Sequence, residues 1–147
     1  MASTIYLFSP VSTIGRIVDR WTGGLGFSHA VIRTESGTWI DCTPKKGVHV
    51  IDPAERNYRV RPSGRVEIEG AAGAYVDHCA ESFVGNQYSD AHNCGSWIVK
   101  ALPPALESWV EDCAARWRIP ISPNALAVAF GVDTDASAVE VAGTGGL

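Results

Sequence analysis

Apolar residues alternate with polar ones, or run together, in five short stretches of the first half of the chain. These stretches are rich in β-branched and aromatic residues, which is typical of β-strands. Glu35, Ser36 and Gly37 separate the second stretch from the third and predict a hairpin loop. We therefore expect a sheet built mainly from the first half, with strands over residues 4–8, 27–33, 38–42, 48–51 and 65–69.

Helical spacing of apolar residues appears first between two of these strands. Ser12 is a good N-cap, and Ile14, Ile17, Val18 and Trp21 follow it at positions i, i+3, i+4 and i+7. This spacing predicts a short amphipathic helix. The second half of the chain is mainly helical in pattern, with helices expected over residues 75–84, 94–102, 106–117 and 123–130.

Length and composition are those of one ordinary domain. The chain has 147 residues, of which 46% are apolar and 19% charged, and this balance indicates a packed core. No apolar stretch reaches the ~18–20 residues of a membrane-spanning helix. We expect a single domain over residues 1–132 and a frayed tail of small residues over 133–147. The N-terminus lacks the features of a Sec signal, so the expected location is the cytoplasm, with non-Sec export or release on lysis as alternatives.

Charge and cysteine content narrow the range of partners. The net charge is −4, and the basic residues are scattered through the first half, so we expect no nucleic-acid partner. The four cysteines form no closely spaced pair, which favours a reducing compartment. Cys79 and Cys113 fall at apolar positions of helical patterns and are expected to be buried.

His29 and Asp41 are polar residues inside two apolar strands. A carboxylate in such a strand is costly unless it has a partner. If the hairpin loop has three residues, Asp41 faces Val31 and becomes the diagonal neighbour of His29 on the same face. A two-residue loop would place them on opposite faces. Taken singly, each residue also fits a structural role, as a core histidine or an edge-strand aspartate.

Cys94 is predicted to open an apolar helix after a polar turn. A helix N-terminus favours the thiolate form of cysteine, the form that acts as a nucleophile. Gly95 would permit the close approach of another backbone. Taken alone, a cysteine at this place is more often structural than reactive.

Three segments together resemble a known family. They are STIYLFSPVSTIGRIVDRWTGGLGFSHAVI, WIDCTPKKGVHV and NQYSDAHNCGSWIVKAL. They resemble the permuted branch of the NlpC-type, papain-like cysteine hydrolases, which includes YiiX-type bacterial hydrolases and lecithin:retinol acyltransferase. The resemblance covers roughly residues 4–130. It implies an α+β, papain-like fold, circularly permuted, with an antiparallel sheet or partial barrel packed on helices.

The resemblance also implies site residues. It assigns Cys94 as the nucleophile, His29 as the general base and Asp41 as the group that orients the imidazole, although this branch more often carries Glu or His in place of Asp41. Tyr88 and Asn93 are candidates for substrate or oxyanion binding. No cofactor is implied. His78-Cys79 and His92-x-Cys94 lack the second ligand pair of a zinc site, so we expect no metal.

The expected function is that of a cysteine hydrolase that cleaves an amide or peptide bond through an acyl-enzyme intermediate. Its partner would be a peptide or another amide-containing substrate, with peptidoglycan peptides as one candidate. Two alternatives stay open. One is an acyltransferase or thioesterase acting on lipid acyl groups. The other is a binding or assembly module that keeps the fold with an idle triad. The sequence does not indicate an oligomeric state.

Overall fold

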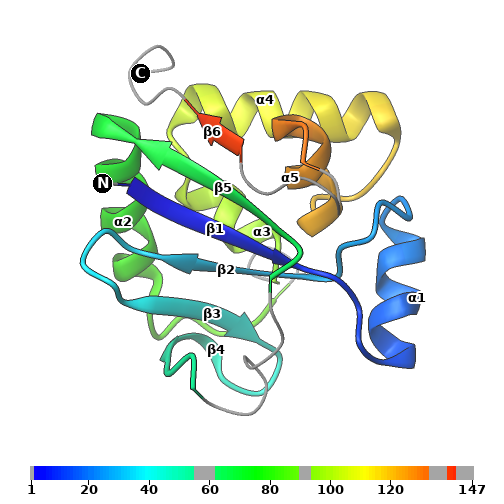
Figure 1. Ribbon diagram of the computed structural model, residues 1–147, viewed down its shortest axis with the longest axis horizontal. Helices are drawn as coiled ribbons and strands as arrows, with labels where there is room; N and C mark the ends of the chain where they lie inside the picture. The colour runs from blue at the N-terminus through cyan, green and yellow to red at the C-terminus, as the bar shows by residue number, and fades with distance from the viewer. Residues whose placement is uncertain (1, 55–61, 90–93, 133–138, 142–147) are drawn as a thin grey trace.

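One sheet forms the centre of the molecule. The computed structural model describes residues 2–54, 62–89, 94–132 and 139–141, which form an α+β fold. The sheet has the strand order β4-β3-β2-β1-β5-β6 (Figure 1). Its first five strands are antiparallel, as the hairpin pattern predicts. The strands are β1 (Ala2–Phe8), β2 (His29–Arg33), β3 (Trp39–Thr43), β4 (Gly47–Ile51), β5 (Gly64–Glu69) and β6 (Val139–Val141).

The short strand β6 corrects the prediction of a frayed tail. Val139–Val141 pairs parallel to β5, at the edge of the sheet. The sequence reading missed this strand because its three residues lie among small and polar neighbours that carry no strand pattern. The other residues of the predicted tail lie outside the described part of the chain.

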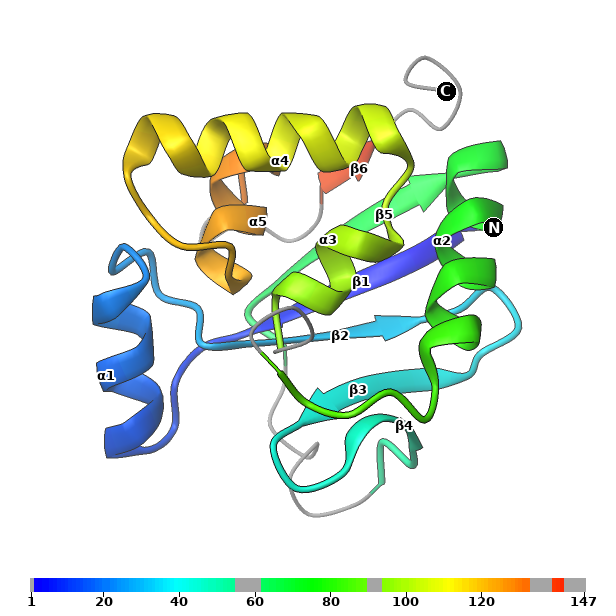
Figure 2. The same ribbon diagram turned by 180° about the vertical axis from the view of Figure 1, so that it is seen from behind.

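Among the described residues, all helices but the first cover one face of the sheet, and the first lies beside the sheet (Figure 2). The helices are α1 (Thr13–Trp21), α2 (Gly70–Phe83), α3 (Ser96–Ala101), α4 (Pro104–Trp117) and α5 (Pro123–Phe130). Helix α2 packs on β1 and β5, and α3 packs on β2. Helices α4 and α5 pack against each other. The main hydrophobic core lies between these helices and the sheet, and Trp97 of α3 is fully buried in it.

The two faces of the sheet carry different apolar clusters, because successive strand residues point to opposite faces. Ile5, Ala30 and Ile40 belong to the helix-covered core. On the other face, Phe8, Val31 and Ile51 form a smaller cluster together with Tyr6 and Trp39. The rings of Tyr6 and Trp39 stack there with their centroids 4.8 Å apart.

Side-chain caps fix the start of two helices. Ser12 accepts a hydrogen bond from the backbone N–H of Gly15 at 3.0 Å, and Ser122 accepts one from the N–H of Ala125 at 3.2 Å. Both caps agree with the sequence prediction. The helix α2 instead begins at Gly70, well before the apolar residues that predicted it, because its glycines and alanines form no apolar stripe.

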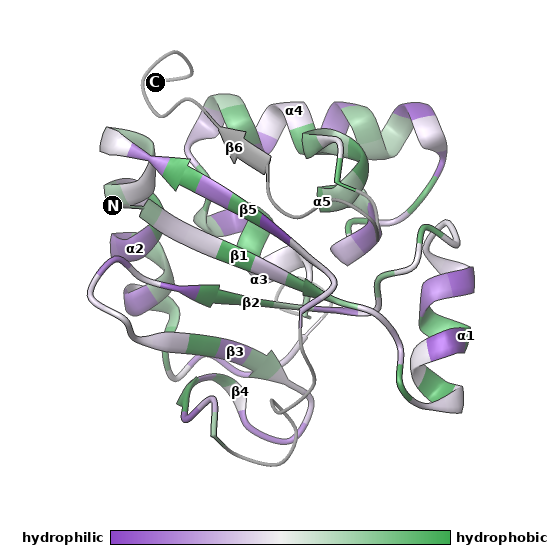
Figure 3. Cartoon of the chain, in the orientation of Figure 1, coloured by the Kyte–Doolittle hydropathy of each residue, from purple (hydrophilic) through white to green (hydrophobic). Residues whose placement is uncertain are grey.

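The apolar face of α1 points into solvent. This face consists of Ile14, Ile17, Val18 and Trp21, which with the preceding Val11 we call the α1 stripe; all five are exposed. Trp21 has 85% of its surface exposed. The helix contains no buried residue. Figure 3 shows the hydrophobic turns of α1 at the side of the molecule, away from the sheet. The predicted helix is therefore confirmed, but its apolar face does not join the core.

Among the described residues, no helix has both the length and the apolar composition needed to cross a membrane.

Candidate active site

The hairpin of β2 and β3 has the three-residue loop on which the predicted site depends. The backbone N–H of Thr34 donates to the carbonyl of Thr38 at 2.8 Å. Ile32 pairs with Ile40 in the same ladder. Continued along the strands, this register places Asp41 opposite Val31 and makes it the diagonal neighbour of His29. The predicted register is confirmed.

His29 and Asp41 form a close ion pair. The imidazole Nε2 of His29 lies 2.9 Å from the carboxylate Oδ1 of Asp41. The Asp41 side chain is fully buried, whereas the His29 side chain is 31% exposed. The backbone N–H of Cys42 also donates to Asp41 Oδ1, at 2.6 Å. A buried carboxylate is tolerated where it accepts such bonds, so Asp41 can fix the orientation of the imidazole while His29 stays accessible.

Cys94 meets the other side of this pair. Its thiol donates to the backbone carbonyl of Ser28 at a sulfur–oxygen distance of 3.7 Å. Ser28 directly precedes His29, so this bond places the thiol beside the imidazole, and Cys94 is one of the groups that raise the pKa of His29. Three side chains from β2, β3 and the segment before α3 thus meet at one imidazole.

The position of Cys94 relative to its helix differs from the prediction. The helix α3 begins at Ser96, with Gly95 as its N-cap, and Cys94 lies in the turn before it. Because the influence of a helix dipole is confined to the first turn, the neighbouring imidazole, rather than the helix, is the main group that can stabilise a thiolate here.

The surroundings of His29 favour its charged form. Burial lowers the pKa of His29, but hydrogen bonds and charge interactions with Asp41 and Cys94 outweigh it and raise the pKa to about 10. Cys42 shows the opposite effect, because burial, followed by the charges of Asp41 and Cys94, raises the pKa of its thiol to about 12.

Close packing of two backbones holds the Cys94 segment. A methyl group on Gly95 would lie 2.6 Å from both the Cα and the carbonyl carbon of Ser122. Only glycine leaves room for this approach, as the sequence reading expected. The N-terminus of α5 therefore braces the residue that follows Cys94.

Asn124 of α5 braces the His29 side of the site. Its Nδ2 donates to the Oδ1 of Asp19 at 2.9 Å and to the Oγ1 of Thr22 at 2.9 Å. Its Oδ1 accepts a bond from the backbone N–H of Phe27 at 3.1 Å, two residues before His29. Asn124 is fully buried. The sequence reading missed it, although an asparagine inside an apolar helix is a signal that could have found it.

Tyr88 lies on the segment that leads to Cys94. It lines a pocket of about 330 Å³ with Lys45, Lys46 and Gln87. This pocket lies at the turn from β3 to β4, at the same end of the sheet as His29. Its part in substrate binding stays a prediction. Asn93, the second predicted binding residue, lies outside the described residues.

Two other cysteines, Cys79 and Cys113, lie on the helices α2 and α4, apart from this site. All four cysteines are free, and Cys113 is buried as predicted. The expectation of a buried Cys79 is wrong, because this residue is only half-buried, at the margin of the main core against which it packs. In the described part of the chain, no group of three or more His, Cys, Asp or Glu side chains is arranged to hold a metal ion.

No protein-family model matches the chain. Comparisons with curated proteins and with solved structures gave no match either.

Proposed function

We propose that the chain is a cysteine hydrolase that cleaves an amide or peptide bond. One observation carries the proposal: the imidazole of His29 contacts the carboxylate of Asp41 at 2.9 Å, and the thiol of Cys94 lies beside the same ring, bonded to the carbonyl of Ser28 and raising the pKa of His29. A nucleophile, a base and an orienting group in mutual contact form the arrangement that covalent catalysis needs. The resemblance to the permuted NlpC-type, papain-like hydrolases, in which the histidine precedes the cysteine, supports the same assignment.

In the first half of the reaction, the Cys94 thiolate attacks the carbonyl carbon of the substrate and forms a C–S bond. The tetrahedral oxyanion needs hydrogen-bond donors, and the backbone N–H of Cys94 with one neighbouring donor would supply them. As the C–N bond breaks, the His29 imidazolium gives its proton to the leaving amine. The product is a thioester on Cys94, and the amine departs.

In the second half, water replaces the amine. The neutral imidazole of His29 takes a proton from the water, and the resulting hydroxide attacks the thioester carbon. The C–S bond breaks, the acid is released, and Cys94 regains its starting form. Asp41 holds the ring in the same orientation throughout and stabilises its charged form.

Alkylation by iodoacetamide tests the pair without a substrate. At about pH 6, where an ordinary thiol is mostly protonated, we expect Cys94 to react well before the other three cysteines. Cys79 is the internal control, because it is also partly exposed but lies on α2, packed against the main core and away from the triad. His29→Ala should slow the reaction of Cys94 sharply at this pH and much less at about pH 9.

Mass mapping of the alkylated protein distinguishes the functional alternatives. Equal, slow labelling of Cys79 and Cys94, unchanged by His29→Ala, would indicate an idle triad and a binding module. If Cys94 is selectively reactive, peptide amides and lipid esters offered side by side then separate an amidase from an acyltransferase or thioesterase. Cys94→Ala should abolish turnover and leave the melting temperature close to that of the unmodified protein.

A further inference from the structure

The α1 stripe is an exposed apolar surface that the proposed chemistry does not use. The stripe is centred on Ile14, Ile17, Val18 and Trp21, all on one side of the helix. Single exposed apolar side chains are ordinary, but a contiguous group ending in a tryptophan marks an interaction site.

The inner side of α1 is fixed, so the stripe cannot turn inward. Gly15 packs there against Pro10 and Ser28. The carboxylate of Asp19 accepts bonds from the backbone N–H of Gly26 and from the Nδ2 of Asn124, both at 2.9 Å. These contacts fix the side of α1 that carries Gly15 and Asp19 against the protein, so the α1 stripe faces solvent.

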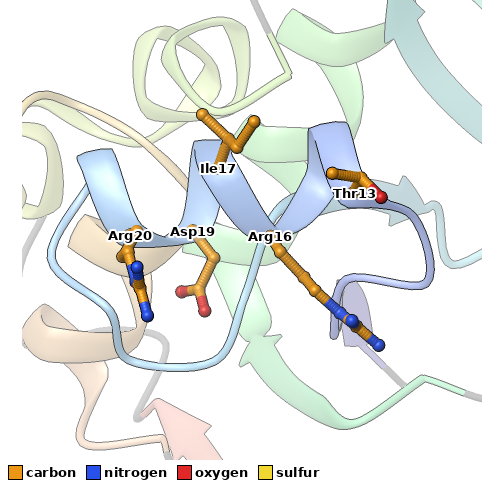
Figure 4. A pocket seen from close by; sticks show the side chains of 5 residues that line it. All are labelled: Thr13, Arg16, Ile17, Asp19 and Arg20. Atoms are coloured by element: carbon orange, nitrogen blue, oxygen red, sulfur yellow. The ribbon is translucent and has the colours of Figure 1, made fainter.

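Two arginines lie beside the stripe. Arg16 and Arg20 are four residues apart, and Arg20 follows Ile17 by three, so these side chains are neighbours on the helix. With Thr13 and Asp19 they line a hollow of about 390 Å³. Figure 4 shows both arginines on one side of α1 and Ile17 on the other. Within the described residues, neither guanidinium takes part in an ion pair. The carboxylate of Asp19 lines the same hollow, but its Oδ1 accepts bonds from Gly26 and Asn124.

The size of the stripe argues against a second copy as its partner. A helix of nine residues is about 14 Å long and roughly 10 Å wide. Two such faces bury far less than the ~1,200 Å² at the low end of specific protein interfaces. An interfacial helix needs no such area, because it inserts apolar side chains into the lipid boundary while basic side chains contact anionic headgroups.

We propose that α1 docks the protein on an anionic lipid surface. The stripe enters the acyl boundary, Trp21 lies at the level of the headgroups, and Arg16 and Arg20 bind headgroup phosphates. The docking is independent of catalysis. One consequence rests on the proposed function: Ser28 lies next to Gly15 on the inner side of α1 and accepts the bond of Cys94. Docking therefore holds the reacting thiol about one helix width, ~10 Å, from the lipid and favours membrane-associated substrates.

Sedimentation of the protein with lipid vesicles tests the proposal. Vesicles contain either phosphatidylcholine alone or equal parts of phosphatidylcholine and phosphatidylglycerol. We expect binding to the mixed vesicles and little to the neutral ones. Ile17→Asp should weaken binding by about tenfold or more, because it removes a buried apolar side chain and adds a repelled charge. Arg16→Gln and Arg20→Gln should each weaken it by about fivefold.

Two substitutions serve as matched controls. Val50 on β4 is 58% exposed and Ile17 is 56% exposed. Val50→Asp therefore adds the same charge at an equally exposed apolar site at the far edge of the sheet, and it should leave binding unchanged. Arg65→Gln on β5 removes one positive charge elsewhere and should have a small effect. Circular dichroism establishes that each variant is folded, and Trp21→Ser provides a second, uncharged test of the stripe.

Four outcomes decide the matter. Binding to anionic vesicles that Ile17→Asp and Trp21→Ser abolish, and that Cys94→Ala retains, supports the proposal whether or not the protein proves to be a hydrolase. No binding to either vesicle overturns it. Equal losses in Ile17→Asp and Val50→Asp also overturn it. A dimer in analytical ultracentrifugation that Ile17→Asp dissociates, without vesicle binding, would assign the stripe to a second copy instead.

Discussion

The carboxylate of Asp41 reaches the imidazole of His29 across a diagonal of the hairpin, at 2.9 Å, although the two residues are not direct partners in the strand ladder. A slip of one residue would place them on opposite faces of the sheet. The loop of three residues that ends in Gly37, which has a φ of 95°, therefore determines whether the pair can form.

Asp41→Asn should reduce activity less than His29→Ala does. Loss of the base removes proton transfer, an effect of about 10²–10⁴-fold, whereas the amide only weakens the orientation and charge of the ring. Asp41→Asn should also destabilise the fold by about 1–3 kcal/mol, because a buried charge-assisted bond is lost. Turnover assays and urea denaturation measure the two effects. Asp52→Asn, at an exposed carboxylate, is the control. If Asp41→Asn lowers activity as much as His29→Ala does, Asp41 has a role other than orienting the ring.

The pH dependence follows from the raised pKa of His29. The folded-state value of about 10 lies above the ordinary 6.5, so the pair's contribution to stability is fully present below pH 6.5 and is lost as the pH rises through about 10. The difference in melting temperature between the unmodified protein and His29→Gln should shrink over the same interval. Turnover should fall above pH 10, where the leaving amine finds no proton donor. An NMR titration of the His29 ring that gives an ordinary pKa would contradict this prediction.

Gly95→Ala should destabilise the protein by about 1–3 kcal/mol, because the added methyl group would overlap the backbone of Ser122. Activity should fall as well, since the shift moves the neighbouring Cys94. Gly15→Ala is the matched control, because its methyl group would approach only side chains of Pro10 and Ser12 at 3.2 Å and alanine favours a helix. Thermal melts compare the two variants, and equal stabilities would show that α5 does not pack closely on Gly95.

Asn124→Ala should destabilise the fold by about 1–3 kcal/mol, because the buried N–H of Phe27 loses its acceptor and the carboxylate of Asp19 loses one of its donors. Asn124→Asp keeps an acceptor for Phe27 but places a second carboxylate beside Asp19, so it should not restore stability. Hydrogen exchange measured at single amides distinguishes the loss of the Phe27 hydrogen bond from a general loss of stability. In Asn124→Ala the amide of Phe27 should exchange faster than the global change in stability explains, because its acceptor is gone, whereas in Asn124→Asp it should not. The amide of Ile68 in β5 should follow the global change in both variants.

Much of the fold follows from local sequence signals. Strand alternation gives five of the strands, and the Gly37 turn gives the register that brings His29 to Asp41. Ser12 and Ser122 mark helix starts because their hydroxyls satisfy backbone N–H groups locally. Each of these signals involves residues close together in the chain, which is why the sequence reveals them.

The parts that were missed depend on distant packing. Apolar spacing shows which side of α1 is hydrophobic, but not that this side points to solvent. The bonds of Asn124 span about 100 residues of sequence, to Asp19, Thr22 and Phe27. The packing of Ser122 on Gly95 is also long-range, and although Gly95 suggested a close approach, nothing in the sequence named its partner.

The bracing by α5 has a consequence for the order in which the protein is made. The three reacting side chains leave the ribosome in the order His29, Asp41 and Cys94, and Ser122 follows Cys94 by 28 residues. Until that later segment emerges, the contacts of α5 with Gly95 and with the N–H of Phe27, just before β2, are missing. A nascent chain therefore holds every group of the proposed chemistry before it can align them, and its reactivity begins only when the last helix docks.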